Sequence, residues 1–481
     1  MQGAHRTAAM TTAIPDGLVL PDRVETRLGT LTFADGVPDD ATVALLNDNL
    51  DFQRAVQAHL VTLPAASMAA LRGGLRNFGT DNGTVVMFAS LLDARSLFLT
   101  LDTDTVYAFA WIGLRGGPVV VECPTGVVGL VNDVWGRYVA DLGLAGPDHG
   151  HGGEYLLVPP GHDGYVPDGF HVVAAPAYNN LVMLRGFAVG DDPAPVAAGI
   201  RARLRIYPLA EAGRPRPTHI VDVSGVPFST IPPHGAATFE LLHDLLEEEP
   251  ADALDPETLG LLASLGIAKG QRFAPGERLR AILAEAAVVA AATERANAYR
   301  TRLEAAFLYP GSAWCSPFVG GSHEFLHDHA RLLDARTFMY FHAFGVTPTL
   351  AARHVGSGSV RAAAFVDADG RRFDGARRYR LRLPPSIPAR HGWSVVLYDT
   401  QTRSMLQTDQ RFPSISSRRG GIVAADDGAI EIEFGPVPPE RGAVNWLQTV
   451  PEKGWSTMLR LDGPLQAFFD GSWRPGEVEA V

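Results

Sequence analysis

The sharpest chemical signal in the sequence is a literal H-E-x-x-H motif, formed by His323, Glu324 and His327. On a helix this spacing would place two imidazoles one turn apart on one face, where they could bind zinc, with Glu324 as the base for a metal-bound water. Two glycines just ahead of the motif, Gly320 and Gly321, disfavour a rigid helix. A zinc-dependent hydrolase is therefore an alternative hypothesis, and a fortuitous match is the preferred interpretation.

A second polar group, Asp102, Asp104 and Tyr107, begins a predicted strand. Carboxylates at positions i and i+2 lie on the same face of a strand. Paired carboxylates can bind a cation, or divide acid and base roles when their environments separate their pKa values. We take these three residues as candidate catalytic groups. The competing interpretation, which we favour, is that the two aspartates cap a turn.

Five further residues are candidates for ligand binding. Tyr178 and Arg185 could present a phenol and a guanidinium to an anionic or carbonyl ligand. Trp393, Asn445 and Trp446 could form the opposite wall, from the C-terminal part of the chain. Aromatic side chains in a β protein more often belong to the core.

The elements that must position these residues follow from the apolar periodicity. After a lead-in over residues 1–38, Phe52, Val56 and Leu60 recur every four residues and predict a helix that Pro64 ends. From residue 85 the period changes to two, which predicts a mostly antiparallel N-terminal β module within residues 39–210. Its candidate strands are 85–88, 97–101, 106–111, 119–122, 155–158, 170–174, 181–185 and 204–207.

A helical connecting region is expected over residues 211–345. Its clearest helix lies between Pro275 and Pro310, where apolar residues recur at three- and four-residue spacing and Gly276 is the only breaker. The many alanines in this helix indicate close packing against another helix or a sheet.

Residues 346–481 return to a strand pattern, and residues 378–383 alternate arginine with apolar side chains, as in a half-solvated sheet. The predicted fold is therefore a multidomain, β-rich α+β protein. It has two antiparallel β-sandwich-like modules joined by a helical segment.

Several stretches resemble a large bacterial family that pairs domain of unknown function 1254 with domain of unknown function 1214. In the first module they include Leu101-Asp102-Thr103-Asp104-Thr105-Val106-Tyr107 and Asn132-Asp133-Val134-Trp135. In the second they include Asn445-Trp446-Leu447-Gln448 and Phe468-Phe469-Asp470-Gly471-Ser472-Trp473. The resemblance implies two β modules with a helical connection in a protein that self-associates, and it assigns no catalytic residue.

The composition excludes several classes of partner. The chain has 481 residues, 46% of them hydrophobic, and a formal net charge of -12. This acidic balance argues against nucleic acid or an anionic membrane as partner. Every apolar run is interrupted before the ~20 residues of a membrane span, so a soluble protein is expected. Only Cys123 and Cys315 are present, which precludes a multi-cysteine zinc site.

The functional expectation is a small polar ligand bound or processed in a cleft between the two modules, in a protein that forms a homo-oligomer. If the protein is an enzyme, hydrolysis without an organic cofactor is favoured, because no nucleotide or dinucleotide motif is present. The alternative from another class is a non-catalytic binding or assembly protein. The first fifteen residues hold no apolar leader, so the expected compartment is the cytoplasm, or the periplasm or exterior if a leader has been trimmed.

Overall fold

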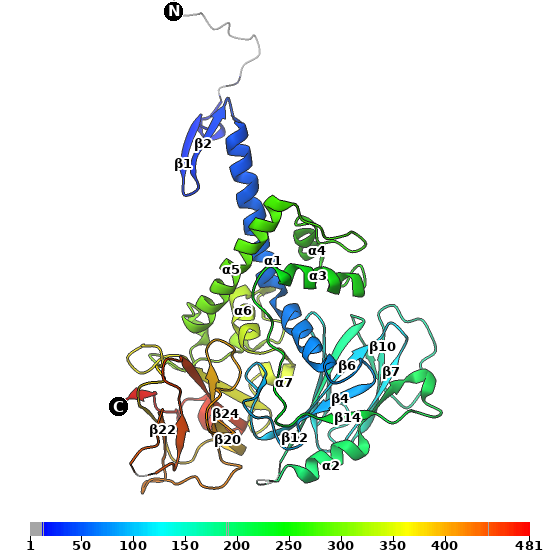
Figure 1. The fold of residues 1–481 in the computed structure, drawn as a ribbon, viewed down its shortest axis with the longest axis vertical. Helices are drawn as coiled ribbons and strands as arrows, with labels where there is room; N and C mark the ends of the chain where they lie inside the picture. The colour runs from blue at the N-terminus through cyan, green and yellow to red at the C-terminus, as the bar shows by residue number, and fades with distance from the viewer. Residues whose placement is uncertain (1–11, 13, 189, 191, 441) are drawn as a thin grey trace, which may run out of the picture.

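The computed structural model describes residue 12 and residues 14–188, 190, 192–440 and 442–481. These residues form a multidomain α+β protein with two β modules side by side (Figure 1). Helices cover the modules on one side, and a small β sheet projects from the far end of the helical part (Figure 1). This projecting sheet consists of β1 (Arg23–Thr26), β2 (Gly29–Ala34) and β3 (Val37–Pro38).

The N-terminal module is a sandwich of a six-stranded and a four-stranded sheet. The larger sheet has the order β14 (His219–Asp222), β4 (Thr84–Met87), β6 (Thr105–Gly113), β12 (Asn179–Phe187), β8 (Val128–Asp133) and β9 (Tyr138–Gly143). The smaller sheet has the order β11 (His171–Ala174), β10 (Gly153–Val158), β7 (Val119–Cys123) and β13 (Arg205–Pro208). Apolar side chains such as Val121, Tyr155, Val182 and Leu184 fill the space between the sheets. Most strand pairs are antiparallel, as predicted; β10 with β11 and β4 with β14 are parallel.

This module differs from the sequence expectation in three places. Strands β8 and β9 were not predicted, and β14 extends the sheet beyond residue 210. The strand expected at 97–101 is reduced to the two-residue β5 (Ser96–Leu97). The chain after β5 leaves the sheet pattern and enters the space between the two modules, where its polar residues find partners.

The prediction that Pro64 ends the first helix is wrong. Helix α1 (Asp40–Arg76) continues through Pro64 for 37 residues, starting at an N-cap in which the Asp39 carboxylate accepts a hydrogen bond from the Thr42 N–H. An interior proline costs a helix ~3 kcal/mol. Here Leu63, Pro64 and Met68 are all buried, and the packing of this half of α1 compensates for the lost hydrogen bond.

The helical region packs around α1. It contains α3 (Ala237–Glu248), α4 (Pro256–Ala263), α5 (Glu277–Tyr299) and α6 (Leu333–His342). The helix predicted after Pro275 is confirmed as α5, and its buried alanines, among them Ala286 and Ala290, pack against α1. The buried side chains of His59 and Glu294, with Nε2 and Oε1 3.0 Å apart, also bring α1 and α5 together.

The C-terminal module is a second sandwich, of two four-stranded sheets. One has the order β18 (Ser359–Ala364), β24 (Trp455–Pro464), β20 (Ala389–Asp399) and β21 (Ser414–Ser416). The other has the order β23 (Trp446–Gln448), β22 (Ile430–Gly435), β19 (Tyr379–Leu383) and β25 (Glu479–Ala480). In β19 the two arginines are exposed and Tyr379, Leu381 and Leu383 are buried, which confirms the predicted alternation.

Among the described residues, no helix has the length and apolar character needed to cross a bilayer. Cys123 and Cys315 are both buried free thiols.

Candidate functional site

A cavity of about 520 Å³ lies between the two β modules. Strands β6, β8, β9 and β12 of the first module form one part of its wall. The segment 343–358, which contains the short helix α7 (Pro348–Ala351), and residues of β18 and β20 form another part. The lining is mainly apolar and includes Leu99, Leu101, Val128, Leu130, Leu144, Met183, Phe187, Phe344 and Leu350.

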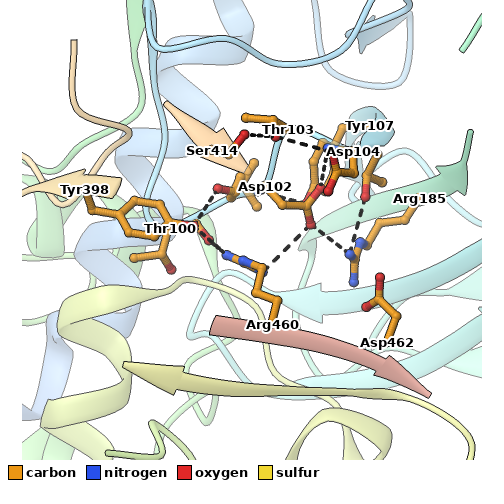
Figure 2. A network of polar contacts seen from close by, with 12 residues as sticks. Thr100, Asp102, Thr103, Asp104, Tyr107, Arg185, Tyr398, Ser414, Arg460 and Asp462 are labelled. Atoms are coloured by element: carbon orange, nitrogen blue, oxygen red, sulfur yellow. Dashed lines mark hydrogen bonds and ion pairs between the residues drawn. The ribbon is translucent and has the colours of Figure 1, made fainter. Parts of the chain in front are cut away.

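A buried polar network lies at the wall of this cavity and joins the two modules. Figure 2 shows Arg185 and Arg460 pointing toward the carboxylate of Asp102. Asp102 Oδ2 accepts hydrogen bonds from Arg185 Nη2 at 3.0 Å and from Tyr107 Oη at 2.8 Å. Arg460 Nη1 lies 3.8 Å from the same oxygen, and Arg460 also donates to Tyr398 Oη at 2.9 Å. Because Arg460 and Tyr398 belong to the second module, the network holds the modules together.

Strand register explains how the first module presents these groups. Tyr107 on β6 and Arg185 on β12 are directly opposite each other in the antiparallel pair. The Arg185 guanidinium lies over the Tyr107 ring, 5.6 Å from its centre. Both residues line the cavity, so two of the residues singled out in the sequence are neighbours at this site.

The charge state of Asp102 favours a charge-balancing role over proton transfer. Burial alone would raise its pKa, but the guanidinium groups of Arg185 and Arg460 hold the pKa of Asp102 well below its usual range. Burial and the Asp102 charge raise the pKa of Tyr107 above its ordinary value. At neutral pH Asp102 is therefore a carboxylate, and Tyr107 is a neutral phenol that donates to it.

Asp104 has a different environment from Asp102. Its backbone N–H donates to Asp102 Oδ1 at 3.1 Å, which closes a turn ahead of β6. Its own Oδ1 lies 3.3 Å from Arg419 Nε, and burial raises its pKa. Neither aspartate lines the cavity, and this turn geometry is the interpretation that the sequence favoured for the pair.

Arg361 on β18 lines the same cavity and was not predicted from the sequence. Its side chain has no hydrogen bond or ion pair with any described residue, and its Nε atom is buried without a partner. Burial and the neighbouring Arg460 and Arg185 lower the pKa of Arg361 to about 10, so it remains a cation at neutral pH. The sequence does contain a pattern that could have identified Arg361. It is the single charged residue of a short segment rich in alanine, a composition that indicates burial.

Asp141 on β9 is the carboxylate that faces the cavity. Burial raises the pKa of Asp141 to about 6, and its Oδ2 accepts a hydrogen bond of 3.4 Å from Tyr138 Oη. Such a value suits a group that takes up and releases protons near neutral pH. Asp141 was not predicted as a site residue, because strand β9 was not predicted. His354 and His391 also line the cavity.

The structure places the other ligand-binding candidate of the first module elsewhere. The guanidinium of Arg115 lies over the Tyr178 ring, 5.5 Å from the ring centre. The backbone N–H of Tyr178 donates to Glu249 Oε2 at 2.7 Å. It does not line the cavity between the modules.

The three candidates of the second module are also away from the cavity. Trp446 donates from Nε1 to the Gly435 carbonyl at 3.1 Å. Asn445 bonds through its amide group to the backbone of Val423 and so holds a loop. Trp393 is half-buried at the edge of the second core. The predicted wall formed by these residues is therefore replaced by Ser359, Arg361 and His391.

The H-E-x-x-H residues do not form a helix, so the geometric basis of the zinc hypothesis is wrong. His327 belongs to the two-residue strand β16 (Leu326–His327), and Phe325 has a left-handed φ of 57°. Together with Glu324, His323 lines a different cavity, where it packs against Tyr138. Within the described residues, no group of three or more His, Cys, Asp or Glu side chains is arranged to hold a metal ion.

Comparison with family models finds one match in each β module. Residues 83–208 match the protein of unknown function DUF1254, and residues 358–466 match the protein of unknown function DUF1214. The chain therefore carries both domains, DUF1254 before DUF1214, in the order that its motifs implied.

A solved structure shows a similar fold in another protein. The crystal structure of the VPA0106 protein from Vibrio parahaemolyticus is similar, with 20% sequence identity and a TM-score of 0.55. The match covers 90% of this chain and 100% of that one. A putative uncharacterized protein from Burkholderia cenocepacia matches with 13% identity and a TM-score of 0.40, over 91% and 96% of the two chains. No curated protein matches the chain.

Proposed function

We propose that the protein binds a small organic molecule in the cavity between its two β modules. The observation that carries this proposal is the cavity itself, about 520 Å³ in volume and built from both modules and the segment between them. Small-molecule sites are typically concave, 300–1,000 Å³ in volume and mostly apolar, with a few fixed polar groups. Arg185, Arg361 and Asp141 would be those polar groups here.

The pairing of Asp102 with arginines of both modules supports the proposal. These contacts fix the relative position of the modules, so the cavity is formed before a ligand enters. Preorganisation of this kind lowers the entropic cost of binding. A pocket at a junction of two modules also lets a ligand contact residues that are distant in sequence.

A ligand screen by thermal shift tests this proposal. A bound ligand at 100 times its Kd stabilises the folded state by about 2.7 kcal/mol. Leu350 lines the cavity, and Leu350→Trp fills part of it; the matched control is Leu333→Trp on α6, at a side chain that is 51% exposed. Ligands that stabilise the wild type and Leu333→Trp are expected to lose their effect on Leu350→Trp. Equal stabilisation of both variants would refute the site.

A second candidate function is cofactor-independent hydrolysis at the same cavity, favoured by the position and raised pKa of Asp141. In this reaction the Asp141 carboxylate takes a proton from a water molecule as the water oxygen bonds to an acyl carbon of the ligand. The bond between that carbon and the leaving group then breaks, and Asp141 returns the proton to the leaving group. The established general-base role of carboxylates contributes 10²–10⁴-fold in rate.

A panel of small esters and amides tests the hydrolytic candidate. Asp141→Asn is expected to abolish turnover, and the exposed control Asp163→Asn to retain it. The rate for wild type should rise with pH around 6 as Asp141 loses its proton. Turnover that survives in Asp141→Asn would exclude this role and leave the non-catalytic binding function.

We also propose self-association, the assembly function expected from the sequence. The sheet β1–β2–β3 has no buried residue, and it projects from the end of the helical part away from the two β modules (Figure 1). Small sheets of this kind need a packing partner to be stable. Apolar residues on the long helices α1 and α5 are also exposed, namely Val43, Leu50, Val288 and Val289. A second copy related by twofold symmetry would cover both surfaces at once.

A further inference from the structure

We infer that the ligand of the cavity between the modules is an organic anion whose charged group is bound by Arg361. This inference rests on the proposed binding function and specifies the class of ligand. It depends on a different observation from the cavity itself, namely an excess of buried positive charge with unused hydrogen-bond donors.

Strand register brings two of the cations together. Arg361 on β18 and Arg460 on β24 are directly opposite each other in an antiparallel pair. Side chains at such positions are only about 4.5–5.5 Å apart at their Cβ atoms, and like charges there are destabilising. Arg185 of the first module is close enough to Arg361 to lower the pKa of Arg361, and the charge of Arg460 acts in the same direction on the pKa of Arg185.

The carboxylates around this cluster do not balance its charge. Asp102 is shared between Arg185 and Arg460, and it makes no ion pair with Arg361. The other two nearby carboxylates are already paired, Asp104 with Arg419 at 3.3 Å and Asp462 with Arg418 at 3.1 Å. Asp141, across the cavity lining on β9, has no ion pair with Arg361 either. Arg185 is also attracted by the charge of Asp462, which Arg418 shares. Positive charge still exceeds negative charge around Arg185, Arg361 and Arg460, and Arg361 has no ion pair with a described carboxylate.

Unused donors accompany this excess charge. The Nε atoms of Arg185, Arg361 and Arg460 are all buried without a hydrogen-bond partner. A buried donor without a partner costs ~1–3 kcal/mol, and more when it is charged. Arg361 has no other partner and lines the cavity, so an oxyanion inside the cavity is the group that would satisfy it.

The lining indicates what is attached to the anion. Ser359 lies two residues before Arg361 on β18, so both point to the same side, and Ser357 and Gly358 of the preceding turn also line the cavity. Most of the other lining is apolar. The ligand is thus an anionic head group on an apolar body. Carboxylate and phosphate share the chemistry that a guanidinium recognises, and separate probes distinguish them.

Isothermal titration calorimetry on the full chain tests the inference. The probes are linear carboxylates of four to ten carbon atoms, with alkyl phosphates and primary amides of the same lengths. We expect one of the two anionic series to bind, and the matched amides to bind at least about 30-fold more weakly, as for loss of a buried charge pair. Arg361→Met should weaken anion binding by a similar factor. Arg353→Met removes an equal charge from an exposed site of the same segment and should bind as wild type does.

A stability measurement separates ligand binding from a structural role. Because Arg361 forms no ion pair with a described residue, its replacement leaves no other buried charge uncompensated. Without ligand, the Arg361→Met variant should therefore melt at or above the wild-type temperature. A fall in melting temperature would show that Arg361 serves the fold, and would overturn the inference. Amides that bind wild type as tightly as the anions would overturn the inference. If those amides no longer bind Leu350→Trp, the cavity proposal remains intact. If wild type binds no probe of any series, the inference fails, and the thermal-shift screen alone then decides the cavity proposal.

Discussion

At the scale of single residues, the carboxylate of Asp102 is the group on which the junction of the modules most depends. It is buried, ionised and bonded to Arg185 and Tyr107, and it lies beside Arg460. A buried ion pair adds little net stability relative to an apolar replacement, but removal of one partner leaves the other charge uncompensated. The loss of the Asp102 carboxylate would leave the buried charges of both Arg185 and Arg460 without this partner.

Asp102→Asn is therefore expected to lower the free energy of unfolding by roughly 3–5 kcal/mol. Tyr107→Phe removes one hydrogen bond from the same carboxylate and should cost only about 1 kcal/mol. Urea denaturation of both variants measures the difference. Equal effects of the two substitutions would contradict the assignment of Asp102 as the charge partner of the arginines.

Asp141 should show the opposite behaviour, since burial of its charge opposes folding. Its folded-state pKa is raised from 3.8 to about 6, so its favourable contribution is complete below pH 4 and is lost as the pH rises to 6. Above pH 6, Asp141→Asn should be more stable than wild type by on the order of 1–2 kcal/mol, after allowance for partial exposure. Urea denaturation at pH 4 and pH 8 tests this; a gain in stability of the same size at both pH values would exclude the linkage.

At the scale of elements, a glycine sets the distance between α1, α6 and the sheet of the first module. Gly136, after β8, has a φ of 75°, and an added Cβ would lie 2.7 Å from Pro64 Cβ and 3.1 Å from the Tyr340 ring. Pro64 is in the middle of α1, and Tyr340 on α6 donates a hydrogen bond to the Gly136 carbonyl. This close contact is part of the packing that keeps α1 continuous.

Gly136→Ala should destabilise the protein by about 2–4 kcal/mol, the sum of backbone strain and a steric clash. Gly126→Ala is the matched control, because Gly126 has the same φ of 75° with no atom within 4 Å of an added Cβ. That substitution should cost only the strain, ~1 kcal/mol. Chemical denaturation that gives equal losses for both glycines would show that the clash is relieved.

At the scale of the whole molecule, the projecting sheet and the exposed face of the long helices predict an oligomer. Val43→Glu combined with Leu50→Glu places charges on this exposed face of α1 and should yield monomers. The control Val172→Glu alters an equally exposed valine on β11 and should leave the assembly unchanged. Light scattering coupled to gel filtration gives the mass; a monomeric wild type would refute self-association.

The sequence by itself determined the features that depend on local or periodic patterns. The alternation in β19 and the helix α5 follow from the spacing of apolar and polar side chains. The paired family also follows from motifs that are contiguous in sequence. These features are encoded within a few residues of one another, so a single sequence suffices to predict them.

Only the tertiary structure decided the rest, because the decisive contacts join distant parts of the chain. Pro64 stays within a helix since its surroundings are buried, and the H-E-x-x-H residues lie outside any helix because the backbone turns left-handed at Phe325. Asp102 meets Arg460 only when the two modules pack together, and the same packing leaves Arg361 unpaired at the cavity. Charge balance in a buried site is a property of the assembled fold, and no local pattern records it.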